Sequence, residues 1–168
     1  MRRTRGSGKF EFAVVVLVIA VLAVVFLDRI AFYVKRSEKI AMERVASELA
    51  STLRIRVAEL MLANRNAEIA RFDGANPVEA LDYPVSNYVG AGASEARIPG
   101  GRWFFNQQTR ELVYFPNYES NFARAPGERA RVAWRISVVR EAPRPGAAPR
   151  ATWARLELVR PYRWFPAS

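Results

Sequence analysis

The N-terminal part of the chain contains one long, uninterrupted run of apolar residues. Phe12 to Leu27 is a run of 16 apolar residues that lacks Gly, Pro and polar side chains, and Ile30 to Val34 is apolar again after Asp28 and Arg29. A helix rises about 1.5 Å per residue and a hydrocarbon layer is about 30 Å thick, so the run needs this extension to cross a membrane. The pattern predicts a transmembrane helix over 7–34.

Residues 35–72 are predicted to continue the same helix with a narrower apolar face. Neither Gly nor Pro occurs between Gly8 and Gly74, and Ala, Glu, Arg and Leu are frequent from Ser37 onward. Apolar residues recur there at every third or fourth position: Met42, Val45, Leu49, Leu53, Val57 and Leu60. A coiled coil is one use of such a stripe, but its shortness and irregularity favour packing on the protein's own sheet.

Turn signals separate this helix from the C-terminal part. We expect Gly74 to end the long helix. Asn76 followed by Pro77 is typical of a helix start, because asparagine caps well and proline fits the first turn, so a short helix should run to about Leu81. Six Gly and Pro residues come next, and 73–101 is therefore predicted to be a loop with one short helix.

The remaining residues, 102–168, have the patterns of β-strands. Arg102 to Asn106 and Glu111 to Phe115 flank a short polar turn and predict a hairpin, while Ala130 to Val139 and Trp153 to Val159 alternate. Strands with one apolar face need a cover, and the helical stripe offers one. The predicted fold class is α+β: a long N-terminal helix, membrane-embedded in its first half and packed by its second half on a small antiparallel sheet of about four strands.

The amino-acid composition excludes several kinds of catalytic and metal-binding site. The 168 residues include no His and no Cys, which excludes a Cys/His zinc site, a thiol nucleophile, a disulfide and an imidazole base. The glutamates of the C-terminal part have no spacing typical of a catalytic carboxylate pair: Glu111, Glu119, Glu128, Glu141 and Glu157. We expect no enzymatic activity, no cofactor and no metal site; an enzyme that uses paired carboxylates is the alternative.

The apolar run has three interpretations: a membrane anchor, a buried core helix and a cleaved secretory signal. A small domain rarely surrounds an all-apolar helix on every side, which disfavours the core helix. The residues after Leu27 contain no Ala-x-Ala pattern, which disfavours signal cleavage. An uncleaved anchor is therefore expected. Four basic residues precede the run and four follow it closely, so charge leaves its orientation open.

A short motif lies ahead of the apolar run. Three arginines lead to Gly6, and Glu11 stands five positions after it. Here the chain resembles the type IV pilin and type II secretion pseudopilin superfamily, in which a basic leader ends in Gly and the fifth mature residue is Glu. The resemblance implies a leader peptide at 1–6, cleavage by a prepilin peptidase between Gly6 and Ser7, N-methylation of Ser7 and an assembly role for Glu11.

The resemblance also implies a location and a task. It places a single-pass protein in the bacterial inner membrane, with the N-terminus cytoplasmic and the C-terminal domain periplasmic. The expected partners are the membrane, the prepilin peptidase and other pilin-like subunits, which together form a pseudopilus or pilus-like filament for protein secretion. The chain lacks the disulfide or acidic calcium loop of many relatives, so it corresponds to a minor or divergent member.

Positive charge is concentrated in the C-terminal part. The net charge is +10, and from Arg97 onward there are thirteen Arg against five Glu, interleaved with tryptophans. This composition can contact phosphates and stack on bases. The alternative function is therefore a pilin-like or plain signal-anchored protein whose periplasmic domain binds DNA or another anionic partner. The candidate surface is Arg102, Arg131, Arg135, Arg155 and Arg163. The competing interpretation places the tryptophans in the core and the arginines on a solvated face.

Overall fold

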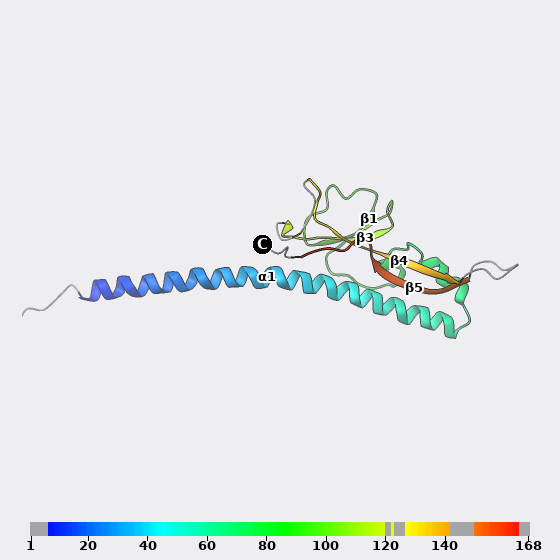
Figure 1. The fold of residues 1–168 in the computed structure, drawn as a ribbon, viewed down its shortest axis with the longest axis horizontal. Coiled ribbons are helices and arrows are strands. Elements are labelled where there is room, and N and C mark those ends of the chain that lie inside the picture. The colour runs from blue at the N-terminus through cyan, green and yellow to red at the C-terminus, as the bar shows by residue number, and fades with distance from the viewer. Residues whose placement is uncertain (1–6, 120–121, 123–126, 142–149, 165–168) are drawn as a thin grey trace, which may run out of the picture. The chain divides into compact units, whose positions relative to one another are not determined.

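A computed structural model describes residues 7–119, 122, 127–141 and 150–164, and the chain divides after Ser37 into two compact units. The fold is α+β, as predicted, with an N-terminal helix and a five-stranded sheet (Figure 1). The elements are α1 (Ser7–Leu62), the 3-10 helix η1 (Asn66–Phe72), α2 (Pro77–Ala80), β1 (Tyr88–Gly92), β2 (Arg102–Asn106), β3 (Glu111–Phe115), β4 (Val132–Glu141) and β5 (Arg150–Leu158). The leader predicted at 1–6 lies outside the described residues.

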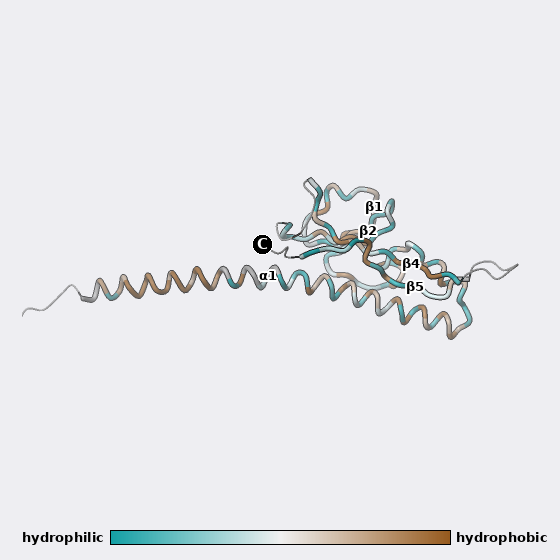
Figure 2. The backbone as a smooth tube through the Cα atoms, viewed as in Figure 1, coloured by the Kyte–Doolittle hydropathy of each residue, from teal (hydrophilic) through white to brown (hydrophobic). Residues whose placement is uncertain are grey.

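The first part of α1 is apolar on all sides. Its 18-residue stretch Phe10–Leu27 is long and apolar enough to cross a membrane, and none of that stretch is buried inside the protein. Figure 2 shows the stretch as predominantly hydrophobic. A core helix would be covered by the rest of the chain, so the core-helix interpretation is wrong. A helix that exposes apolar side chains around its whole circumference is compatible with a single membrane crossing.

The long helix ends earlier than predicted. α1 stops at Leu62, and Asn64 adopts a left-handed conformation with a φ of 55°. The Arg65 N–H donates to the Leu60 carbonyl at 2.8 Å, and a second backbone bond from the Asn64 N–H completes a Schellman C-cap. Asparagine here takes the place that glycine usually occupies. A search for Gly and Pro alone misses this stop signal, so the predicted helix end at 72 is wrong.

Two short helical segments follow α1. The first, η1, buries Ile69 and Phe72. The second, α2, confirms the predicted short helix: the Asn76 side chain accepts a hydrogen bond from the Val78 N–H at 3.2 Å, and Pro77 is the first helical residue. Local chemistry alone specifies this helix start, because the cap and the capped N–H are two positions apart.

The sheet is mixed and has the order β1-β2-β3-β4-β5. Neighbouring strands are antiparallel except β1 and β2, which are parallel. The prediction of a purely antiparallel sheet of about four strands is therefore wrong. The missed strand, β1, contains Gly90 and Gly92 and falls in the predicted loop at 73–101, because glycines usually mark turns. A Cβ at Gly92 would lie 3.3 Å from the Phe104 ring, so glycine lets this edge strand approach β2.

The other predicted strands are confirmed. β2 and β3 form the expected hairpin, in which Asn106 pairs with Glu111 next to the turn. The Asn106 side-chain oxygen accepts the N–H groups of Gln108 and Thr109 at 2.9 and 3.1 Å. These side-chain hydrogen bonds stabilise the turn of a hairpin that has no Asn-Gly pair. The two later strands are β4 and β5, with ends up to three residues from the predicted ones.

Two clusters of buried side chains contain residues of both α1 and the strands. The first contains Met42, Ala46 and Leu49 of α1 with Trp103, Phe105, Leu112, Tyr114, Val132, Trp134 and Trp164. The second contains Leu53, Val57 and Leu60 of α1 with Ile69, Phe72, Ile136, Ala151 and Ala154. Five of the six residues in the predicted stripe are buried, and Val45 is half-buried. The polarity pattern of the helix therefore indicates correctly which side chains leave water.

The sheet also has a second buried patch, which the predicted single apolar face does not include. Phe104, Val113, Phe115 and Ala133 form a cluster of their own. Arg129 covers it, with its guanidinium carbon 3.9 Å from the centre of the Phe115 ring. The same guanidinium donates hydrogen bonds to two backbone carbonyls. A cation that lies on an aromatic ring and has satisfied donors shields apolar surface from water.

Substitution of Leu53 tests the buried stripe. Leu53 is fully buried, whereas Ile55, on the same helix, is 62% exposed. Leu53→Ala should lower the free energy of unfolding by about 2–5 kcal/mol because it leaves a cavity, and Ile55→Ala by less than about 1 kcal/mol. Urea denaturation of the full chain in nonionic micelles, followed by tryptophan fluorescence, measures both. Equal losses would contradict the burial of this face.

Candidate functional site

The predicted processing and assembly residues lie at the start of α1. Gly6 is outside the described residues, and Ser7 is the first residue of the helix. Glu11 is exposed and is the one charged residue of the stretch Phe10–Leu27. Within the described part of the chain, no hydrogen bond or ion pair involves Glu11. The helix therefore presents one carboxylate at the edge of a continuous apolar surface.

Three of the five candidate surface arginines come from three separate segments of the chain. Arg102 donates to the side-chain oxygen of Asn87 at 3.2 Å. Arg155 forms an ion pair with Glu157, its neighbour on the same face of β5. Arg163 is exposed in the segment after β5. Two of these three guanidiniums, those of Arg102 and Arg155, therefore already have partners.

The other two arginines converge on a buried carboxylate. Glu111 is 5% exposed at the start of β3. Arg135 lies 3.2 Å and Arg131 3.8 Å from its oxygens, and the Thr109 hydroxyl donates to it at 3.1 Å. Arg131 also binds both oxygens of Glu95, at 2.9 and 3.2 Å. A buried carboxylate needs such partners, because an unpaired buried charge is strongly destabilising. These arginines are committed to structural pairs.

The tryptophans are mostly unavailable to a ligand. Trp103, Trp134 and Trp164 are 2%, 7% and 7% exposed, whereas Trp153 is 36% exposed. Base stacking needs an accessible ring face. The interpretation that places the tryptophans in the core is therefore correct for three of the four and wrong for Trp153.

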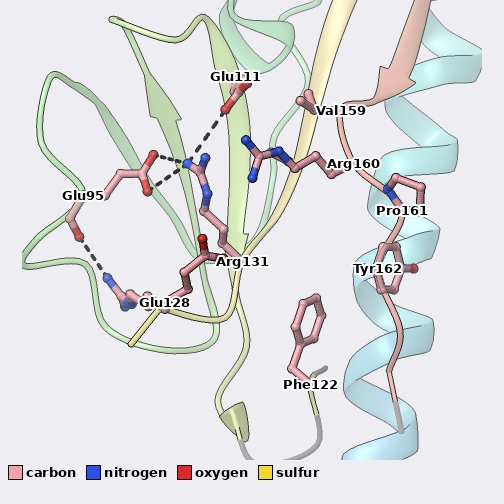
Figure 3. A pocket seen from close by; sticks show the side chains of 11 residues that line it. Glu95, Glu111, Phe122, Glu128, Arg131, Val159, Arg160, Pro161 and Tyr162 are labelled. Carbon is pink, nitrogen blue, oxygen red and sulfur yellow. Dashed lines mark hydrogen bonds and ion pairs between the residues drawn. The ribbon is translucent and has the colours of Figure 1, made fainter. Parts of the chain in front are cut away.

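A cavity of about 430 Å³ lies beside the Glu111 pair (Figure 3). Its polar lining comes from Glu95, Glu111, Glu128, Arg129, Arg131 and Arg160. Its apolar lining includes Phe122, Pro161 and Tyr162. No group of three or more acidic side chains placed to hold a metal ion occurs among the described residues. What the cavity offers chemically is ion pairing and hydrogen bonding next to an aromatic wall.

Three tyrosines donate hydrogen bonds to glutamates of α1, and no sequence signal indicates them. The pairs are Tyr114 with Glu38 at 2.9 Å, Tyr162 with Glu43 at 2.6 Å, and Tyr83 with Glu48. The glutamates are five residues apart, so successive side chains point about 140° apart around the helix axis. The tyrosines therefore bind α1 from different sides. The partners are far apart in sequence, which is why pattern analysis misses them.

Comparisons with known proteins give no relative. No protein-family model matches the sequence, and no curated protein and no solved structure matches it. The class of protein is therefore argued from the chain's own residues and geometry.

The pH dependence of stability tests the Tyr114–Glu38 pair. Burial, and next the Glu38 carboxylate, raise the pKa of the Tyr114 hydroxyl well above its ordinary value of 10.0. Neutral Tyr114 therefore contributes its full stabilisation below about pH 10, and this contribution is lost as the pH rises above that value. Between about pH 8 and pH 11 the wild type should lose up to about 1.4 kcal/mol more unfolding free energy than Tyr114→Phe, which cannot ionise.

Urea denaturation of both proteins at the two pH values measures this difference. Glu38→Gln should reduce the alkaline loss in part, since it removes the second cause of the raised pKa. An identical loss in wild type and Tyr114→Phe would contradict the prediction.

Proposed function

We propose that the protein is a pilin-like structural subunit, a pseudopilin or minor pilin, which a prepilin peptidase processes and which assembles into a periplasmic pseudopilus or pilus-like filament for protein secretion. The observation that carries this proposal is Glu11, a lone carboxylate at the start of an apolar helix whose side chains are exposed. The basic leader that ends in Gly6 supports it.

In this proposal Glu11 acts through a neighbouring subunit. A carboxylate in hydrocarbon costs several kcal/mol unless it is paired. Cleavage after Gly6 creates an amine at Ser7, and the amine of one subunit pairs with Glu11 of the next. The pair offsets the cost of desolvation and sets the axial stagger between helices. The exposed apolar side chains of Phe10–Leu27 then supply lateral packing.

The rest of the chain forms the periplasmic part of the proposed subunit. α1 crosses the inner membrane once with the leader in the cytoplasm, and its second half packs on the sheet. The buried clusters that contain both helix and strand residues support this packing. The tyrosine–glutamate pairs support it independently, since they join α1 to the sheet and loops by polar contacts.

The DNA-binding alternative has less support. Phosphate binding needs free cations, and base stacking needs open aromatic faces. Arg131, Arg135 and Arg155 are engaged with glutamates, and three of four tryptophans are buried. We therefore propose no second function for the domain.

Mass spectrometry of the N-terminus tests the family assignment. Protein isolated from membranes of cells with the prepilin peptidase should begin at a methylated Ser7 and should lack residues 1–6. Protein from cells without the peptidase should retain the leader. A chain that starts at Met1 in both strains would make it a plain signal-anchored protein.

Substitution of Glu11 tests the assembly role separately from processing. Glu11→Ala should still insert in the membrane, because it makes the span more apolar, but its incorporation into filaments should fall at least about tenfold if the charged pair contributes 1.4 kcal/mol or more. Crosslinking and filament pull-down measure incorporation. Glu59→Ala, which removes an exposed carboxylate from the same helix outside the apolar stretch, is the matched control and should assemble normally.

A further inference from the structure

Among the described residues that line the cavity beside Glu111, Arg160 is a cation without a partner. Arg160 is exposed, lines the cavity and extends toward it in Figure 3. No hydrogen bond or ion pair of the Arg160 guanidinium occurs in the part of the chain that the structure describes. The preceding residue is fixed, because the Val159 N–H donates to the Ala133 carbonyl at 2.8 Å. Arg160 is therefore held at the cavity by its backbone while its charged group remains available.

The other charged groups that line the cavity already have interactions of their own. Arg131 binds Glu95, and Arg135, which does not line the cavity, binds Glu111. Arg129 is held by two backbone carbonyls and by the Phe115 ring. These contacts fix the positions of the walls before any ligand arrives, which lowers the cost of ordering on binding.

The charge of the lining limits the kind of anion that fits. Three carboxylates line the cavity with three guanidiniums. A phosphate dianion or a polyanion would bring two or more negative charges close to Glu95, Glu111 and Glu128, and like charges repel strongly when partly desolvated. A single carboxylate brings one charge and matches the planar, bidentate geometry of a guanidinium.

Another part of the cavity lining is aromatic. Tyr162 stacks on Phe122 with ring centres 5.9 Å apart, and its hydroxyl is anchored by Glu43 at 2.6 Å. Such a wall favours an apolar body next to the ligand's charged group. We infer that this cavity binds a monocarboxylate with an apolar body, whose oxygens pair with Arg160 and whose body lies on Tyr162. Either a free organic acid or the C-terminal carboxylate of a peptide carries this chemistry.

Isothermal titration of the full chain in nonionic micelles tests the site, with benzoate as the first probe. Benzoate should bind at least about tenfold more tightly than benzamide, which has the same ring without the charge. Arg160→Gln should remove this preference. Arg163→Gln is the matched control, since Arg163 is an exposed arginine of the same segment that does not line the cavity, and it should leave binding unchanged.

Further probes separate the two sources of the carboxylate. A hexapeptide with a C-terminal phenylalanine acid should bind more tightly than benzoate if the ligand is a peptide, and its C-terminal amide should bind poorly; otherwise benzoate should bind more tightly. Equal binding of benzoate and benzamide, equal binding to Arg160→Gln and wild type, or tighter binding of inorganic phosphate than of either carboxylate would each overturn the inference. These results do not depend on N-terminal processing, so they leave the proposed function untouched.

Discussion

One uninterrupted helix has to satisfy two different surroundings, and the rest of the structure depends on this constraint. Over Phe10–Leu27 the helix has apolar side chains on every side, and none is covered by the protein. From Met42 to Leu60 only one stripe is apolar and buried. The change from a complete apolar surface to a stripe is encoded residue by residue, because helical geometry carries each side chain about 100° around the axis. It determines which part of α1 shares buried clusters with residues of the strands.

Hydrogen bonds to α1 add directional constraints that the burial of apolar side chains cannot provide. Apolar surface is not directional, so burial of a stripe alone does not fix the rotation or the axial position of a helix. Hydrogen bonds from Tyr114, Tyr162 and Tyr83 to three glutamates of α1 restrict both. The Asn117 backbone also donates to Glu38 at 2.7 Å, which adds a fixed point at the start of this part of the helix. These glutamates therefore join α1 to residues that are distant in the sequence.

Sequence analysis succeeded where the cause is local and failed where it is not. The apolar stretch, the stripe, the Asn76 cap and the β2–β3 hairpin each depend on residues a few positions apart, and each was predicted correctly. The parallel strand β1 was missed because glycines usually mark turns, whereas Gly92 of this strand lies against Phe104, a residue on another strand. The cavity was missed for the same reason, since Glu95, Arg131 and Arg160 come from three separate segments.

The excess of arginine suggests a different partner once the ion pairs of the folded domain are taken into account. Counted along the chain, thirteen arginines after residue 96 suggest a polyanion as the partner. In the folded domain Arg131 and Arg135 stabilise buried or half-buried carboxylates, and Arg129 covers Phe115, so these charges are neutralised or screened locally. A polyanion requires many free cations along one surface, whereas the cavity offers Arg160 among fixed carboxylates. The arrangement therefore favours recognition of one carboxylate over attraction to a charged polymer.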